Sequence, residues 1–568
     1  MVSTQSMIQR QNAIRKLAAH KALELPLLPS GFWFHSDVRD NFYYAIHLFA
    51  YCADKEESSD LSEEQRQSAV SLASDMIRKV LVLQVTDSAH PMYGHWPLNL
   101  GTDPSSAKPN LLPVELMGCL IILFYNKYQN ILPIELKSEL NLAILHIYQS
   151  SVYRQPLQQI HHHEAKHTSL KLLLGHQFDD RELLEQGLQF AKQQLQHVRT
   201  FGFKEYGALP WHWHWIQSFT CVWEVVDDAA VRETVGSLLD YLWRLRADYY
   251  LKGTWIGAQS RQWPHDGPKD NNTLLDYIQF GDFPLPSIIT RLEGSSLYTY
   301  EVSDDIRNRA TERSESEEIR RRIQFAGADG QVTEEAHTYV YVTPDYAVGG
   351  IWERREEFDN EQQRWDLTLP LTDPAAAVGV NQAFFFHPGA KYKEGDDRHA
   401  SNYGEVLLHK DTAIQLWDIP AEDTEAIPHL VGCLPKGQWT FTERSGYGKI
   451  GRVYAAFHLQ NEFSSEERAD RISIASPFVN GSNGVVFEAM SGQEASGLGI
   501  DSLEQFAAWM EGNAQASFGD AAEAPEANGK QIAYTTKRQD KLTLTFAGGQ
   551  AVPAINGEPV CWDDYVIG

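Results

Sequence analysis

Residues 337–343 read HTYVYVT, and at this stretch the period of the hydrophobic pattern changes. Upstream of it, apolar residues recur at the spacing i, i+3, i+4 and i+7, as in Phe42, Ala45, Ile46 and Phe49. That spacing is typical of an amphipathic helix. Downstream of it, apolar residues alternate with polar ones, which is the period of a strand. The chain therefore divides into a helical half and a strand half.

The helical half has long connectors rich in Pro, Gly and aromatic residues. Examples are SAHPMYGHWPLNLG at residues 88–101 and FGFKEYGALPWHWHW at residues 201–215. Because a compact bundle has short polar turns, this pattern favours a curved helical array. We predict an (α/α) toroid over residues 1–300.

The strand half contains a series of short alternating segments separated by Gly, Pro, Asn and Asp, among them QAFFFH, EVLLH, AIQLWDI and KLTLTFA. Such a series predicts an antiparallel β-sandwich over residues 331–568. The charged segment at 301–330 is expected to be a linker. The fold class expected from the whole chain is α+β and multidomain, with a toroid followed by a sandwich.

The formal net charge is −27, which disfavours nucleic acid and anionic membranes as partners. No apolar run is long enough to span a bilayer, and the N-terminus lacks the apolar segment of a signal peptide. We therefore expect a cytoplasmic protein. The five cysteines form no CxxC motif, and the sequence leaves open whether copies of the chain associate as a homo-oligomer.

The segment WHWHW at residues 211–215 is expected to be a loop that runs into a helix start. The indole of Trp211 can stack on a sugar ring, and His212 and His214 can donate hydrogen bonds or transfer protons. The alternative is that these aromatic residues only fill the toroid.

A second motif, HHHEAKH at residues 161–167, contains the HExxH pattern in His163, Glu164 and His167. On a helix, this pattern can aim two imidazoles at zinc with the glutamate as general base. No third ligand stands out downstream, so a zinc peptidase site remains an alternative.

A third motif, SRQWPHDG at residues 260–267, combines Arg261, His265 and Asp266 in one loop. A guanidinium offers a planar fork that suits a carboxylate. The alternative is a surface loop with salt bridges. A fourth motif, HPMYGHW at residues 90–96, precedes Asn110 and Glu115, which serve equally well as helix-capping or active-site groups.

In order along the chain, the blocks YGHWPLNL, PNLLPVEL, KHTSLKLLLGHQFDDRELLEQG, FGFKEYGALPWHW and GAQSRQWPHD resemble the α-toroid plus β-sandwich polysaccharide lyases. TYVYVTPDYAVGG and INGEPV are similar to the sandwich domains of these enzymes. The group includes heparinase II/III-like and L-rhamnose-α-1,4-D-glucuronate lyase-like enzymes. The resemblance implies metal-independent β-elimination at a uronic acid, without a cofactor.

The resemblance also implies roles for individual residues. Arg261 with Asn110 would meet the uronate carboxylate. The base and the acid would come from Tyr206, His95, His167 and His212. The sugar platforms would be Trp96, Trp211 and Trp263, and further substrate contacts would come from Glu115, Glu205, His214, His265 and Asp266. The substrate expected is a short or chain-end acidic oligosaccharide.

Two further alternative functions stay open. An inverting glycoside hydrolase would use two of Glu115, Glu205 and Asp266, at a separation of about 6.5–9.5 Å. A carbohydrate-binding protein without catalysis would form no product. The sandwich strands also carry residues suited to a structural zinc site, namely His387, His409, Asp418 and His458.

Overall fold

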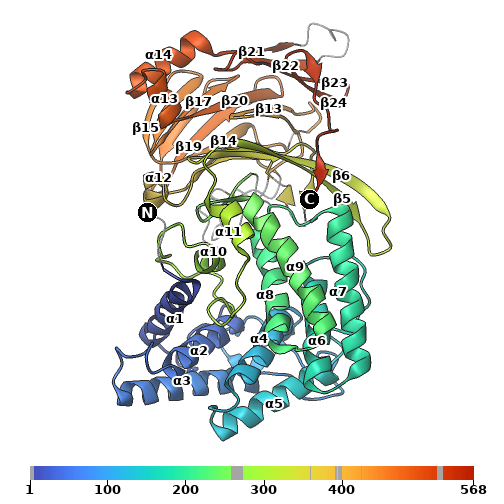
Figure 1. Ribbon diagram of the computed structural model, residues 1–568. Helices are drawn as coiled ribbons and strands as arrows, with labels where there is room; N and C mark the ends of the chain where they lie inside the picture. Colours follow the sequence, from blue (N-terminus) through green and yellow to red (C-terminus); the bar gives the residue numbers. More distant parts are fainter. Residues whose placement is uncertain are drawn as a thin grey trace.

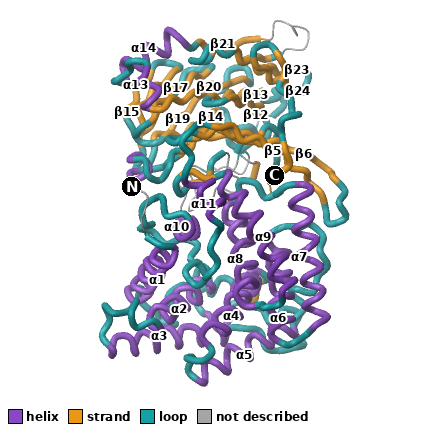
Figure 2. Tube along the Cα trace, viewed as in Figure 1, coloured by secondary structure: helices purple, strands orange, loops and turns teal. Residues whose placement is uncertain are grey.

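The computed structural model describes residues 5–257, 273–357, 360–361, 363–389, 393, 400–423, 425–520 and 529–568. Helices and strands occupy separate parts of the molecule, as Figure 2 shows by colour. Helices predominate up to Thr311, and strands predominate from Glu317 onward. Four candidate residues lie outside the described residues: Arg261, Trp263, His265 and Asp266.

The main helices of the N-terminal part alternate between an inner and an outer position (Figure 1). The inner helices α4, α6 and α8 pack against one another, and α2 packs against α4. Each is covered by the next helix in the chain: α3 packs on α2, α5 on α4, α7 on α6 and α9 on α8. The bounds are α1 (Met7–Glu24), α2 (Val38–Ala53), α3 (Glu63–Val82), α4 (Leu112–Tyr128), α5 (Ile134–Gln149), α6 (His162–Gln177), α7 (Arg181–Phe201), α8 (Leu209–Val225) and α9 (Ala229–Asp248).

The amino-acid sequence explains the two positions. The inner helix α4 is buried at every residue from Pro113 to Phe124, so its apolar residues surround the whole axis. The outer helix α7 buries only one side, with Leu184, Ala191 and Val198 spaced seven residues apart. Within the described residues, no helix is long and apolar enough to cross a lipid bilayer.

Shorter elements join the helices to one another and to the sheets. They are β1 (Trp96–Pro97), β2 (Pro109–Asn110), β3 (Tyr250–Leu251), β4 (Thr254–Trp255), α10 (Leu274–Gln279) and α11 (Asp304–Thr311). In the antiparallel pair of β1 and β2, Trp96 lies opposite Asn110.

In the strand half, the described residues form three sheets of five or more strands, which lie in layers (Figure 1). The nine-stranded sheet has the order β18-β19-β14-β11-β10-β7-β6-β5-β26, and its only parallel pair among the described strands is β26 with β5. Its bounds are β5 (Glu317–Ala326), β6 (Val332–Val342), β7 (Ala347–Ile351), β10 (Trp365–Thr368), β11 (Gln382–Phe386), β14 (His429–Leu434), β18 (Ser464–Glu467), β19 (Ile472–Pro477) and β26 (Val566–Ile567).

The six-stranded sheet has the order β12-β13-β20-β17-β16-β15, and the five-stranded sheet runs from β21 to β25 in sequence order. Their bounds are β12 (Gly404–His409), β13 (Thr412–Asp418), β15 (Gln438–Phe441), β16 (Ser445–Ile450), β17 (Val453–Leu459), β20 (Ser482–Ser491), β21 (Gln515–Asp520), β22 (Lys530–Thr535), β23 (Lys541–Ala547), β24 (Gln550–Ile555) and β25 (Glu558–Pro559). The remaining elements of this half are β8 (Glu356–Glu357), β9 (Asn360–Glu361), α12 (Pro374–Val378), α13 (Gly492–Gly497) and α14 (Leu503–Asn513).

Aromatic side chains fill the space between the nine-stranded and six-stranded sheets. The Trp365 and Phe487 rings lie 5.4 Å apart, and the Phe385 and Phe457 rings lie 5.3 Å apart. Each pair joins one sheet to the other, which makes the two sheets a sandwich. The five-stranded sheet packs against β12 and β13 as a further layer that the sequence pattern did not predict.

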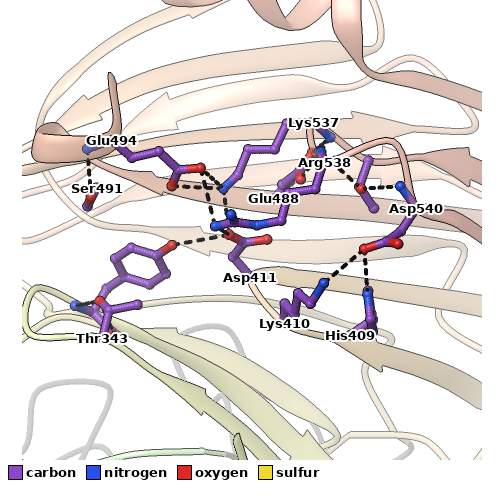
Figure 3. A network of polar contacts seen from close by, with 12 residues as sticks. Thr343, His409, Lys410, Asp411, Glu488, Ser491, Glu494, Lys537, Arg538 and Asp540 are labelled. Atoms are coloured by element: carbon purple, nitrogen blue, oxygen red, sulfur yellow. Dashed lines mark hydrogen bonds and ion pairs between the residues drawn. The ribbon is translucent and has the colours of Figure 1, made fainter. Parts of the chain in front are cut away.

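A buried ion-pair network holds the six-stranded sheet to the turn between β22 and β23 (Figure 3). Asp411, in the turn between β12 and β13, accepts hydrogen bonds from Lys537 Nζ at 2.5 Å and from Arg538 at 2.8 Å. Glu488 on β20 accepts from the Tyr534 hydroxyl at 2.6 Å. Glu494 on α13 also binds Lys537. Because charges and acceptors are matched, the network compensates for their burial.

This order of a helical toroid followed by antiparallel sheets confirms the expected fold class. The stretch HTYVYVT begins inside β6 and ends just after it, as its alternation indicates. The segment 301–330, expected to be a linker, contains α11 and β5, and β5 belongs to the nine-stranded sheet. The domain limits themselves stay a prediction.

Candidate functional site

Glu115 on α4 gathers three side chains from α6. His163 Nδ1 lies 2.9 Å from Glu115 Oε1 and 2.8 Å from Oε2, and His167 Nε2 lies 3.2 Å from Oε1. Lys166 Nζ forms an ion pair with the same carboxylate. Positions 163, 166 and 167 share one face of α6 because they are three and four residues apart. The helix therefore presents these three groups together to Glu115.

The charge of Glu115 is fixed by these neighbours. Burial alone would raise the pKa of the carboxyl group, since only 4% of Glu115 is exposed. The positive charge of Lys166, the hydrogen bonds from His163 and the nearby His167 outweigh burial and hold this pKa well below its ordinary value. Glu115 is thus a buried anion in contact with His163, Lys166 and His167.

A second carboxylate, Glu205, binds the first residue of α6. His162 Nδ1 lies 2.5 Å from Glu205 Oε1, and the His162 backbone N–H donates to Oε2 at 3.0 Å. The indole N–H of Trp215 also donates to Oε2, at 2.7 Å. Trp211 stacks on the His162 ring, with centroids 5.0 Å apart and planes inclined by 6°. The imidazole is therefore fixed in its plane as well as at one nitrogen.

Burial opposes ionisation of Glu205, but His162 and the Trp215 N–H outweigh it and lower the pKa to about 2. Burial also lowers the pKa of His162 to about 4, although Glu205 opposes this effect. At neutral pH the pair is therefore a carboxylate and a neutral imidazole whose Nδ1–H donates to it. Among the described residues nothing binds His162 Nε2, which leaves this nitrogen to accept a proton.

The two carboxylate groups are joined by neighbouring imidazoles. The His162 and His163 rings lie 4.1 Å apart, and the His214 ring on α8 lies 5.6 Å from His162. Burial, Lys166 and His162 together hold the pKa of His214 well below its ordinary value. We call this set the imidazole cluster; it consists of Glu115, His162, His163, Lys166, His167, Glu205, Trp211 and His214.

The WHWHW segment is helical, whereas a loop entering a helix was expected. Helix α8 begins at Leu209, because Pro210 in its first turn has no N–H to leave unpaired. The helical period then divides the segment between two sides. Trp211 and His214 face α6, while His212 packs edge-on against Phe203 at 5.3 Å.

His212 and Tyr206 lie in the aromatic core beside the cluster. His212 is 1% exposed, and burial lowers its pKa to about 3. The Tyr206 ring lies 5.3 Å from Tyr249 and 5.7 Å from Trp255, and burial raises the pKa of its hydroxyl well above the ordinary value. A catalytic role for either residue stays a prediction.

His95 lies at the edge of the imidazole cluster. Its Nδ1 is 3.1 Å from the Tyr93 carbonyl, and its buried Nε2 has no hydrogen-bond partner within the described residues. Burial lowers the pKa of His95, and the charges of Glu115 and His167 also act on it. This position is compatible with the proton-transfer role expected for His95.

Trp96 and Asn110 have structural partners. Trp96 is fully buried and donates its indole N–H to the Val80 carbonyl at 2.9 Å, so it offers no face to a sugar. Asn110 Oδ1 accepts the Leu112 N–H at 2.9 Å, just before α4. The burial of Trp96 argues against its expected role as a sugar platform. The Asn110 contact occupies only Oδ1, so the role of its amide N–H as a carboxylate donor stays a prediction.

The glutamate of the HExxH pattern does not face the two histidines. The Glu164 carboxylate accepts backbone N–H groups of Gln158 at 2.7 Å, Gln159 at 3.1 Å and Ile160 at 2.6 Å. His163 and His167 bind Glu115 instead. In the described ranges, no group of three or more His, Cys, Asp or Glu residues is placed to hold a metal ion.

The histidines considered for a structural zinc site have other partners. His387 bonds to Ser401 and to the Ile427 carbonyl, both at 2.7 Å. His409 pairs with Asp540 at 2.9 Å, and His458 Nδ1 lies 2.9 Å from the Ser445 hydroxyl. With Asp418, they form no common cluster in the described part of the chain.

No protein-family model matches the chain, and no curated protein matches it. Among solved structures, the chain is similar to a heparinase III at 10% identity and a TM-score of 0.38, covering 96% of this chain and 91% of that one. It is similar to a chondroitinase AC lyase at 8% identity and a TM-score of 0.43, covering 99% of each chain. A β-arabinofuranosidase of family GH127 is similar at 9% identity and a TM-score of 0.27, covering 98% of this chain and 85% of that one. These likenesses are too distant to assign an activity to this chain.

Proposed function

We propose that the protein is a lyase that cleaves uronate-containing glycans by β-elimination at the imidazole cluster. The observation that carries the proposal is the state of its two buried carboxylates. Glu115 and Glu205 both have a lowered pKa, and each binds an imidazole. The groups left to transfer protons are therefore the imidazoles.

In the proposed reaction, His162 Nε2 accepts the C5 proton of the uronate. The electron pair of that C–H bond forms the C4–C5 double bond, and the C4–O bond breaks. His163 acts as the acid in its doubly protonated form: Nδ1–H donates to the Glu115 carboxylate, and Nε2–H passes to the departing oxygen. Arg261 remains our candidate for neutralising the substrate carboxylate, which would make the C5 proton more acidic.

The same observation disfavours an inverting hydrolase at this cluster. Such an enzyme needs one carboxylic acid with a raised pKa to protonate the leaving group. The lowered pKa of both Glu115 and Glu205 keeps them ionised at neutral pH. Neither carboxylate can therefore serve as that acid.

The test is a panel of uronate oligosaccharides, followed by the ultraviolet absorbance of a C4–C5 double bond conjugated to the carboxylate. We expect absorbance to rise with wild-type protein and to vanish with His162→Ala. His176→Ala is the control, because His176 lies near the other end of the same helix, close to Asp227. New reducing ends without this absorbance would indicate hydrolysis. Binding without any product would indicate a carbohydrate-binding protein.

A further inference from the structure

An open cavity of about 580 Å³ lies between the helical half and the nine-stranded sheet, beside the imidazole cluster. Glu205 belongs to its lining and also binds His162 inside the cluster. The helical half contributes Gln159, His161 and Lys204, and the hairpin of β5 and β6 contributes residues from Phe325 to Glu334. Its volume lies within the range of small-ligand sites.

The walls of this cavity are held by backbone hydrogen bonds. Ala328 N–H, in the hairpin, donates to the Gln158 carbonyl of the helical half at 2.9 Å. Gln158 belongs to the loop that precedes α6. On the other side of this loop, the Glu164 carboxylate accepts the backbone N–H groups of Gln158, Gln159 and Ile160. The loop that carries Gln159 is thus fixed from both sides, so the cavity is formed before a ligand arrives.

The cations that line the cavity have partners within the protein. Arg355 binds Glu334 at 2.7 Å, and its guanidinium lies 3.3 Å from the centre of the Phe325 ring. Lys204 donates to the Gln159 carbonyl. Burial lowers the pKa of His161, which favours its neutral form. Since Glu205 and Asp329 add negative charge, the cavity does not suit an anionic ligand.

The remaining lining groups suit hydroxyl groups. Gln159 and Gln331 each carry an amide that can donate and accept. The Thr333 hydroxyl donates to the Phe325 carbonyl at 3.0 Å, so its oxygen is oriented to accept. Asp329 Oδ1 accepts the Gln331 backbone N–H at 3.0 Å, which fixes the Asp329 side chain in the hairpin turn. Such a set of donors and acceptors without net positive charge matches a neutral, polyhydroxylated ring.

We infer that this cavity is a subsite for a neutral sugar residue of the glycan, next to the uronate at the imidazole cluster. The inference rests on the proposed function for the identity of the neighbouring uronate. Glu205 links the two sites, because the same carboxylate borders the cavity and orients His162. The substrate class is therefore a glycan in which uronate and neutral sugars are adjacent.

The experiment measures binding of neutral di- and trisaccharides without carboxylates by saturation-transfer NMR. Thr333→Trp places an indole in the cavity from an exposed strand position. Val332→Trp is the matched control, because successive side chains of a strand point to opposite faces and Val332 is 43% exposed. We expect wild type and Val332→Trp to bind, and Thr333→Trp to lose at least about tenfold in affinity.

Wild-type protein that binds no neutral sugar, or Thr333→Trp that binds as tightly as wild type, would overturn the inference. The second readout is the KM for glycans that carry a neutral sugar beside the uronate. We expect it to rise roughly tenfold in Thr333→Trp relative to Val332→Trp. Loss of neutral-sugar binding in Thr333→Trp, with no unsaturated product from any uronate glycan, would refute the proposed function and retain the sugar subsite.

Discussion

His162 Nδ1 lies 2.5 Å from Glu205 Oε1, and the carboxylate also accepts the Trp215 indole N–H. This pair assigns the proton of the imidazole to Nδ1 at neutral pH. Nε2 is then the basic nitrogen, and its orientation is set by residues of three segments: α6, α8 and the loop between α7 and α8. The position of the proposed base is thus fixed by tertiary structure.

Replacing Glu205 tests this orientation through the pH dependence of activity. Glu205 raises the pKa of His162 against the effect of burial, so Glu205→Gln should lower that pKa further. Because the neutral ring is the base, activity falls as pH falls through the pKa of His162. We expect the acid limb of kcat/KM to move to lower pH, and kcat to fall by roughly 10²- to 10⁴-fold. An unchanged pH profile would remove His162 as the base.

Replacing Glu115 tests the buried charges. Glu115→Gln leaves Lys166 without a counter-ion at 3% exposure, so we expect unfolding to become easier by about 3–5 kcal/mol in urea at neutral pH. Adding Lys166→Met should restore part of this loss. The folded-state pKa of Glu115 is lowered, so its contribution is complete above about pH 4.3 and is lost as pH falls through the lowered value. The free energies of unfolding of wild type and Glu115→Gln should therefore converge at acid pH.

Replacing Glu164 tests whether this residue anchors a loop or serves as the base of a zinc site. We expect Glu164→Ala to increase the hydrogen exchange of the Gln158, Gln159 and Ile160 amides, because all three donate to its carboxylate. Thermal unfolding of the whole protein should change much less than exchange in this loop. If exchange is unchanged and only activity is lost, the zinc peptidase alternative regains support.

Replacement of Trp96 should affect stability, whereas replacement of Trp211 should affect catalysis. Trp96→Phe removes the bond to the Val80 carbonyl, so we expect a loss of about 1–3 kcal/mol in stability and unchanged kinetics. Trp211→Leu removes the ring stacked on His162, so we expect kcat to fall by roughly 10- to 100-fold. Urea titration and steady-state kinetics of both variants check this. Equal kinetic losses would place Trp96 in the site.

Glu488, in the network of Figure 3, should make folding stability depend on pH in the opposite direction to Glu115. Burial and the nearby Asp411 raise the pKa of Glu488 to about 8. Its protonated form therefore stabilises the fold fully below about pH 4.3, and this contribution is lost as pH rises through about 8. We expect Glu488→Gln to lose less stability than wild type over that range. Glu466→Gln, on an exposed strand, should behave as wild type.

The sequence predicts the fold class because hydrophobic period is a local signal. The change at residues 337–343 marks β6, and the block around Phe42 marks α2. The five-stranded sheet as a third layer escaped prediction because strand pairing and layer packing depend on distant residues. Alternation within a strand says which side is buried, and it does not say what covers that side.

Only part of the site could be predicted, because contacts between segments also depend on residues that are distant in the sequence. Five members of the imidazole cluster are candidates from the sequence: Glu115, His167, Glu205, Trp211 and His214. His162 was missed because its partner Glu205 is 43 residues away. The spacing of His163, Lys166 and His167 could have indicated a shared face. Nothing in the sequence indicates that Glu115 lies against this helix face, because Glu115 is 48 residues from His163.

The parallel pairing of β26 with β5 has a consequence for how the chain folds. Asp564, beside β26, binds Arg320 of β5 across 244 residues of chain. The sheet that forms one wall of the proposed sugar cavity thus acquires this edge strand only after nearly the whole strand half has been synthesised. The toroid, whose helices pack on their neighbours in sequence, can form during translation. The edge of this sheet is thus completed by the last of the described strands in chain order, whereas each inner helix is covered by the helix that follows it.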